Sequence, residues 1–133
     1  KKLLDTSLAI VDKRRPAPNQ SEVMHIIGDV QGKNCILVDD MADTAGTLCQ
    51  AAKALRDQGA NEIIACVTHP VLSGAAINNI ENSVLTKLIV SDTIPLSPEG
   101  ESSSKIEVVS CADLIRSAIE RIHNCGSISE ISY

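Results

Sequence analysis

The sequence predicts an α/β fold in which helices flank a mostly parallel central sheet. Two observations predict this class. Short apolar runs alternate along the chain with segments whose apolar residues recur at helical spacing. One apolar run ends at two adjacent acids, Asp39 and Asp40, and a short loop then opens a helix. The 133 residues are expected to form a single domain that spans residues 1–133.

Six short apolar runs are predicted to be strands, because aliphatic and β-branched residues favour that conformation. The charged, proline-rich residues 12–20 predict a loop after the first run, and the second run is expected to be antiparallel to the first. The third run is uninterrupted by polar residues, which predicts a buried central strand. His69 and Pro70 are expected to break the chain after the fourth. The runs cover residues 8–11, 23–28, 35–38, 63–67, 88–90 and 106–109.

Three segments are predicted to be helices. The first covers residues 44–58, where four apolar residues recur at helical spacing and Gly59 is placed to end the helix. Ser73 and Gly74 are predicted to begin the second, which continues over residues 75–80. The third lies near the C-terminus, and its apolar residues form one face that is expected to pack on the sheet. That face consists of Leu114, Ile115, Ala118, Ile119 and Ile122.

Composition limits the partners. A net charge of −5 gives little support to a nucleic-acid partner. No apolar run approaches the ~20 residues of a membrane span, and the N-terminus does not resemble a signal peptide. Five cysteines without a CxxC pair predict free thiols in a reducing cytoplasm and do not suggest a zinc site. The chain has no Phe or Trp, so a nucleotide base would stack on something outside this chain.

The loop after Asp39 and Asp40 has the composition of a sugar-phosphate site. A helix N-terminus offers unpaired N–H groups and about half a positive charge to a phosphate. Thr44 and Thr47 can donate hydroxyl hydrogens to the same group, and Gly46 permits a close approach because it has no Cβ. Ionised carboxylates only accept hydrogen bonds, so the acid pair suits ribose hydroxyls or metal-bound water.

Plainer interpretations exist for some of these residues. A solvated strand end whose carboxylates cap turns could also carry the acid pair, although the pattern favours the functional interpretation. Asp43 would repel a phosphate dianion, so we expect it to act as an N-cap or a brace for the loop. His69 is expected to be structural rather than catalytic.

Lys13, Arg14 and Arg15 form the one basic cluster of the sequence. A solvated basic loop would have this composition. So would a mobile arm that covers a polyphosphate and neutralises charge during phosphoryl transfer. In such an arm an Arg can bind phosphate through two hydrogen bonds, and a Lys acts as a point charge.

Six segments, in order along the chain, resemble ribose-phosphate pyrophosphokinase (phosphoribosyl pyrophosphate synthetase) of the bacterial class I type. Residues 38–47 resemble its ribose 5-phosphate loop, and residues 11–16 resemble its flexible catalytic loop. The resemblance implies a type I phosphoribosyltransferase-like fold. It also implies transfer of pyrophosphate from ATP to the 1-hydroxyl of ribose 5-phosphate, which gives phosphoribosyl pyrophosphate and AMP. The other matching segments are residues 26–30, 68–74, 92–96 and 127–129.

The resemblance also implies roles for individual residues. Lys13 resembles the active-site lysine, and Arg15 is implied in catalysis and in binding ribose 5-phosphate. Asp39 is implied as a further contact of that substrate, and Asp40 is expected beside the ribose. The implied contacts in the loop itself are Asp43, Thr44, Ala45, Gly46 and Thr47.

The family is longer than this chain, so the chain is expected to be the C-terminal domain without its N-terminal partner domain. That partner holds most ATP contacts and the ligands of the required Mg²⁺, so no metal ligand is assigned here and the chain is expected to be inactive alone. Family members are cytoplasmic and form hexamers built from dimers.

Two other functions are open on the residues alone. A phosphoribosyltransferase that consumes phosphoribosyl pyrophosphate would share the acid pair and the loop, although the run Lys13 to Pro16 favours the synthetase. A non-catalytic regulatory homologue would keep the fold. The presence of Lys13, Arg15, Asp39 and Thr47 argues against it.

Overall fold

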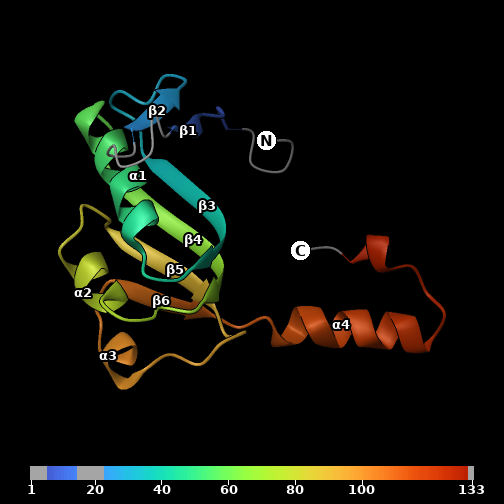
Figure 1. The fold of residues 1–133 in the computed structure, drawn as a ribbon. Coiled ribbons are helices and arrows are strands. Elements are labelled where there is room, and N and C mark those ends of the chain that lie inside the picture. Colours follow the sequence, from blue (N-terminus) through green and yellow to red (C-terminus); the bar gives the residue numbers. More distant parts are fainter. Residues whose placement is uncertain (1–5, 15–22, 132–133) are drawn as a thin grey trace.

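The centre of the molecule is a four-stranded parallel sheet (Figure 1). The structure, a computed structural model, describes residues 6–14 and 23–131. Strands β1 (Ile10–Arg14) and β2 (Val23–Ile27) form a separate antiparallel pair, as predicted. The parallel sheet confirms the predicted α/β class. Its strands lie side by side in chain order and are β3 (Cys35–Ala42), β4 (Ile63–Pro70), β5 (Lys87–Ser91) and β6 (Ile106–Val109).

The helices between these strands lie on one side of the sheet. Parallel strands that follow one another in chain order are joined by right-handed crossovers, which place every connecting helix on the same face. Figure 1 shows α1 and α2 together on that face, and α4 beyond the sheet on the other side. None of the described helices is long and apolar enough to cross a membrane. The helical segments are α1 (Gly46–Asp57), α2 (Ala76–Glu81), α3 (Pro98–Glu101), α4 (Ala112–His123) and the 3₁₀ helix η1 (Ile128–Glu130).

The core lies between α1, α2 and the covered face of the sheet. The strand register aligns Leu37, Ala65 and Leu88 on this face. Ala65 and Leu88 have no exposed surface, and neither does Ala52 of α1. Full burial of a Leu contributes about 2 kcal/mol by the area estimate, so this layer holds α1 against the sheet.

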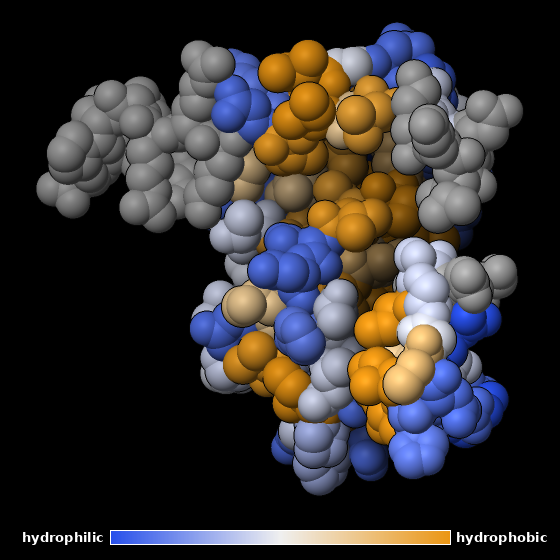
Figure 2. Space-filling model, turned by 90° about the vertical axis from the view of Figure 1, so that its right-hand side faces the viewer, coloured by the Kyte–Doolittle hydropathy of each residue, from blue (hydrophilic) through white to orange (hydrophobic). Residues whose placement is uncertain are grey.

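The opposite face of the sheet is open in the described part of the chain. Successive side chains of a strand point to opposite faces, so Ile36 and Val38 face away from α1, with 60% and 79% of their surface exposed. Figure 2 shows this side of the molecule, where apolar side chains line a hollow. The prediction of a buried central strand over residues 35–38 was therefore wrong. Among the described strands β3 is an edge strand with one covered face.

The apolar stripe of α4 is likewise unburied. The helix contains all five residues of the predicted apolar face, but none of its side chains is buried. Ile119 and Ile122 each expose 61% of their surface. The expectation that this face packs on the sheet was wrong for the described residues, because the chain leaves β6 in a direction that carries α4 away from it (Figure 1).

Strands β1, β3 and β4 extend beyond their predicted ends, because pairing with a neighbour overrides local composition. β3 continues to Ala42, four residues past its predicted end. β1 includes Asp12 to Arg14, which pair with β2, so the predicted loop begins later. β4 includes His69 and Pro70, which pair with the last two residues of β3. The predicted break at this point was wrong. The pairing of β4 with β5 ends at Val67. Pro70 lies beyond that point, so its missing N–H interrupts no hydrogen bond between these two strands.

The proline- and serine-rich stretch at residues 95–104 contains a short helix that the sequence did not predict. Ser97 caps α3 by accepting a hydrogen bond from the Gly100 N–H at 3.2 Å. Pro98 occupies the first turn, where its missing N–H costs nothing. Gly59 ends α1 with a positive φ of 86°, as predicted.

Candidate functional site

A hollow of about 270 Å³ lies where β3 ends and α1 begins. It is formed by one continuous stretch, residues 39–48, which contains seven of the predicted site residues. The structure therefore brings these residues together around a single space. They are Asp39, Asp40, Asp43, Thr44, Ala45, Gly46 and Thr47.

Three consecutive carbonyl groups of this loop are held from one side. The N–H of Leu72 donates to the Ala42 carbonyl at 3.0 Å, and the N–H of Ser73 donates to the Asp43 carbonyl at 3.0 Å. The side-chain amide of Asn79 donates to the Thr44 carbonyl at 2.9 Å. Every described peptide bond is trans, so the N–H that follows each carbonyl points the opposite way. The amides of residues 43, 44 and 45 therefore point away from the β4–α2 side, and these three residues line the hollow.

Ala45 completes the turn into the helix. Its φ of 58° is left-handed, which costs a residue other than glycine about 1–2 kcal/mol. Its side chain is 5% exposed and packs in the core, and its carbonyl accepts the first helical hydrogen bond, from the Cys49 N–H at 2.9 Å. A left-handed residue at a helix start lets successive N–H groups converge on one point, which is an anion-binding geometry.

Gly46 is not required by the fold itself. A Cβ at this position would meet only the Thr44 hydroxyl among nearby atoms, at an ordinary 3.7 Å. Its backbone is not left-handed either. The space above Gly46 therefore belongs to the hollow, and a side chain there would occupy part of it.

Asp43 braces the loop and does not cap the helix. Its carboxylate accepts a hydrogen bond from the Ser73 hydroxyl. The N-cap residue of α1 is Ala45, and no side chain caps this helix. Of the two roles expected for Asp43, the structure supports the brace, and it places the negative charge against Ser73.

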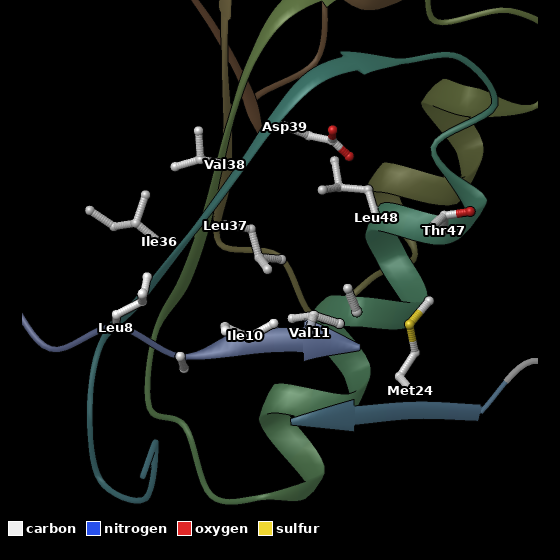
Figure 3. A pocket seen from close by; sticks show the side chains of 12 residues that line it. Leu8, Ile10, Val11, Met24, Ile36, Leu37, Val38, Asp39, Thr47 and Leu48 are labelled. Atoms are coloured by element: carbon white, nitrogen blue, oxygen red, sulfur yellow. The ribbon is translucent and has the colours of Figure 1, made fainter. Parts of the chain in front are cut away.

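Asp39 and Asp40 lie within β3, two residues before its end, and not at the predicted strand end. Both are exposed and both line the hollow. The Asp39 carboxylate accepts a hydrogen bond from the Asp40 N–H at 2.9 Å. Figure 3 shows it turned toward the start of α1, where Thr47 and Leu48 lie. Asp39 therefore faces the same end of the helix as the loop amides.

A second, apolar groove of about 440 Å³ joins this site to β1. It runs between β1, the edge of β3 and the first turn of α1 (Figure 3). Val11 and Met24 line one part of it, and Asp39 and Thr47 line another. The backbone of Lys13 pairs with that of Met24 in the β1–β2 ladder. Arg15 lies outside the described residues.

The polar side chains at the ends of β4 and β5 hydrogen-bond to one another and to the main chain. The Nδ1 atom of His69 is 3.0 Å from the Thr93 hydroxyl, and that hydroxyl donates to the Thr68 carbonyl at 3.0 Å. This arrangement agrees with the structural role expected for His69. Ser91 donates to the same carbonyl at 2.6 Å, so the network ties the ends of β4 and β5 together.

All five cysteines are free thiols. Burial raises the pKa of Cys49 and of Cys66, which keeps both in the neutral form near neutral pH. Neutral, partly buried thiols are inert, as the cysteine count predicts.

Sequence analysis missed the residues behind the loop. Leu72 acts through its main chain, so no residue type at that position could reveal it. Asn79 lies 35 residues from its partner Thr44, and no local pattern links them. Ser73 was expected to start a helix and lies in the matching segment 68–74, but its contact with Asp43 was not predicted.

Comparison with known proteins identifies the family. Residues 6–132 match the phosphoribosyl synthetase-associated domain. The ribose-phosphate pyrophosphokinase of Bordetella parapertussis is 57% identical over 130 residues, which are 98% of this chain and 42% of that protein. The enzyme of the same name from Marinomonas sp. is 56% identical over 129 residues, covering 97% of this chain and 41% of the relative.

A solved structure agrees with the sequence relatives. The phosphoribosylpyrophosphate synthetase of Mycobacterium smegmatis superposes with a TM-score of 0.72 at 36% identity. The match covers 78% of this chain and 35% of the other. This chain thus spans about two fifths of the length of the curated relatives that it matches. The chain belongs to the phosphoribosyl synthetase-associated domain family.

Proposed function

We propose that this chain is the ribose 5-phosphate-binding part of a ribose-phosphate pyrophosphokinase. One observation carries the proposal. The amides of residues 43–45 point away from the β4–α2 side, in a loop that lines the same hollow as Asp39 of the preceding strand β3. A phosphate ester of a sugar has a doubly charged end for the amides and hydroxyl groups for the carboxylate. The names of the relatives favour this reaction over that of a phosphoribosyltransferase.

The loop would bind the 5-phosphate at the start of α1. Its amides and the partial positive charge of the helix attract the dianion, and the hydroxyls of Thr44 and Thr47 can donate further hydrogen bonds. Asp39 and Asp40 would accept hydrogen bonds from the ribose hydroxyls. Asp43 does not oppose the phosphate, since its carboxylate is engaged by Ser73.

The reaction follows from that anchoring. The ribose 1-hydroxyl attacks the β-phosphorus of ATP in line, loses its proton, and the bond from the β-phosphorus to the oxygen retained by AMP breaks. A fixed 5-phosphate places the attacking oxygen and so removes orientational entropy from the barrier. Lys13 and Arg15 would stabilise the negative charge that spreads over the transferring group. The position of β1 supports this, because Val11 borders the groove that reaches Asp39.

Mg²⁺ would come to this chain with the substrate phosphates. No group of three or more His, Cys, Asp and Glu side chains is placed to hold a metal ion in residues 6–14 and 23–131. Mg²⁺ at phosphoryl-transfer sites keeps several waters, and Asp39 or Asp40 would accept hydrogen bonds from such metal-bound water. When bound, it would neutralise phosphate charge.

ATP and the other subunits of an assembly would bind outside the hollow described above. ATP would bind chiefly to the portion of the relatives that this chain does not match. Assembly into hexamers built from dimers and a cytoplasmic location belong to the same proposal, and the five free thiols support a reducing compartment.

A chimera tests the proposal. This chain replaces the matching 42% of the Bordetella parapertussis enzyme, and formation of phosphoribosyl pyrophosphate is measured. We expect activity, and we expect Lys13→Ala to lower kcat by about 100-fold or more with little change in the KM for ribose 5-phosphate. Lys53→Ala is the matched control, because Lys53 pairs with Asp57 at the far end of α1. An inactive but folded chimera would contradict the proposal.

A further inference from the structure

We propose that Asn79 is a positioning residue that holds the phosphate-binding loop in its binding orientation, an inference that rests on the proposed function. Its Nδ2 donates to the Thr44 carbonyl at 2.9 Å from the side away from the hollow. Asn79 is thus placed to act on the ligand through the loop and not by touching it.

Rotation of the peptide between Thr44 and Ala45 would reverse which of its polar groups the loop presents to a ligand. Type I and type II turns differ in the orientation of the peptide that joins their two central residues. In a type II turn the residue after this peptide has a positive φ. Ala45 has such a φ. In the observed orientation its N–H points away from the β4–α2 side, whereas rotation would point the Thr44 carbonyl oxygen that way. That oxygen would repel a phosphate, so the orientation of this one peptide determines whether the loop attracts or repels the ligand.

Asn79 is anchored well enough to select the orientation. It lies in α2, is half-buried, and its own N–H donates to the Ala75 carbonyl at 2.9 Å. Its carbonyl accepts a hydrogen bond from the Cys49 thiol of α1 at 3.5 Å. The neighbouring Ala76 and Ile80 are completely buried in the core. The side-chain amide therefore extends toward the loop from a fixed helix.

Asn79 also differs from the other two donors behind the loop. Leu72 and Ser73 donate from the main chain to the carbonyls of Ala42 and Asp43, so a change of their side chains leaves those hydrogen bonds in place. The bond to the Thr44 carbonyl comes from a side chain. Of the three hydrogen bonds to the loop carbonyls, this is the one that a side-chain substitution can remove.

The test is a calorimetric titration of the full chain with ribose 5-phosphate, in the wild type and in three variants. Asn79→Ala removes the donor, and Asn79→Asp replaces it with a carboxylate that can only accept. Asn82→Asp is the matched control, because the Asn82 amide donates to the Asn78 carbonyl at 2.8 Å within its own helix and reaches no loop residue. We expect about 10-fold weaker binding or more for Asn79→Asp, a smaller loss for Asn79→Ala, and less than a twofold change for Asn82→Asp.

A second measurement separates positioning from a loss of folding. In ¹⁵N-labelled protein we expect ribose 5-phosphate to shift the Ala45 amide signal and the Asn79 side-chain signal of the wild type, and not the Asn82 side-chain signal. Asn79→Asp should keep the dispersed spectrum of a folded chain but lose the Ala45 response. If the wild type binds and Asn79→Asp binds equally well, or the Asn79 signal does not respond, the inference is wrong although the proposed function stands. If the wild type does not bind, the proposed function fails.

Discussion

Ser73 contacts Asp43 through both its main chain and its side chain. Its N–H donates to the Asp43 carbonyl at 3.0 Å, and its hydroxyl donates to the Asp43 carboxylate. The two residues are 30 positions apart, and this double contact joins the β4–α2 connection to the loop before α1. It fixes the orientation of the Thr44 amide and holds the Asp43 carboxylate against the Ser73 hydroxyl.

Removal of the Ser73 hydroxyl should loosen this junction without abolishing it. We expect Ser73→Ala to lower the free energy of unfolding by about 1 kcal/mol and to weaken ribose 5-phosphate binding several-fold, because the Asp43 carboxylate is released. Urea denaturation and calorimetry measure the two effects. Ser102→Ala is the control, since Ser102 donates to the Pro98 carbonyl in α3, which forms no part of the site. Equal ligand affinities in the two variants would contradict the brace.

The carboxylate of Asp39 should matter more for the sugar than for the fold. It is exposed and turned toward the start of α1, so Asp39→Ala should leave the unfolding free energy within about 0.5 kcal/mol of the wild type. Loss of a hydrogen bond to a charged group corresponds to roughly 10- to 100-fold weaker binding of ribose 5-phosphate. Asp57→Ala, at the other end of α1, is the control for charge. An unchanged affinity for Asp39→Ala would remove Asp39 from the ribose site.

Much of this architecture was predictable, and the exceptions share a physical cause. Local periodicity located β6, α1 and α4 because each depends on its own pattern of apolar residues. It could not show that Asp12 or Pro70 belongs to a strand, since those assignments depend on pairing with a distant segment. The same holds for the site. The loop residues are local in sequence, whereas the Asn79 contact that orients the loop is not.

The uncovered face of β3 has a consequence for stability. Val38 exposes 79% of its surface and Val90 of β5 exposes 1%. Val38→Ala should cost less than about 0.5 kcal/mol, whereas Val90→Ala should cost about 2 kcal/mol from lost burial and the cavity left behind. Urea denaturation of both variants compares two identical substitutions in one sheet. Similar losses would mean that the face carrying Val38 is covered in solution.

Asp92 gives the chain a specific sensitivity to acid. The Cys111 N–H, at 2.8 Å, and the Ser110 hydroxyl donate to its carboxylate, and these hydrogen bonds lower its pKa below the ordinary 3.8. A carboxyl group with a lowered pKa in the folded state stabilises the fold above the unfolded pKa, and that contribution is lost as the pH falls through the folded value.

Asp92→Asn should therefore reduce the acid sensitivity of the chain. We expect the Tm of the wild type to fall more steeply than that of Asp92→Asn between about pH 5 and about pH 3, which spans the ordinary range of an aspartate. Above this range the variant should be the less stable of the two. Thermal unfolding followed by circular dichroism across this range makes the comparison. Parallel curves for the two proteins would show that the Ser110 and Cys111 contacts do not form in solution.

The central claim is that the turn between β3 and α1 is a phosphate site, and a crystal of this chain grown with ribose 5-phosphate tests it most directly. The account predicts electron density for the 5-phosphate within hydrogen-bond distance of the amides of residues 43–45, with the ribose hydroxyls toward Asp39. Density for the sugar phosphate at any other position, or a Thr44 carbonyl turned into the hollow beside an unoccupied loop, would contradict it.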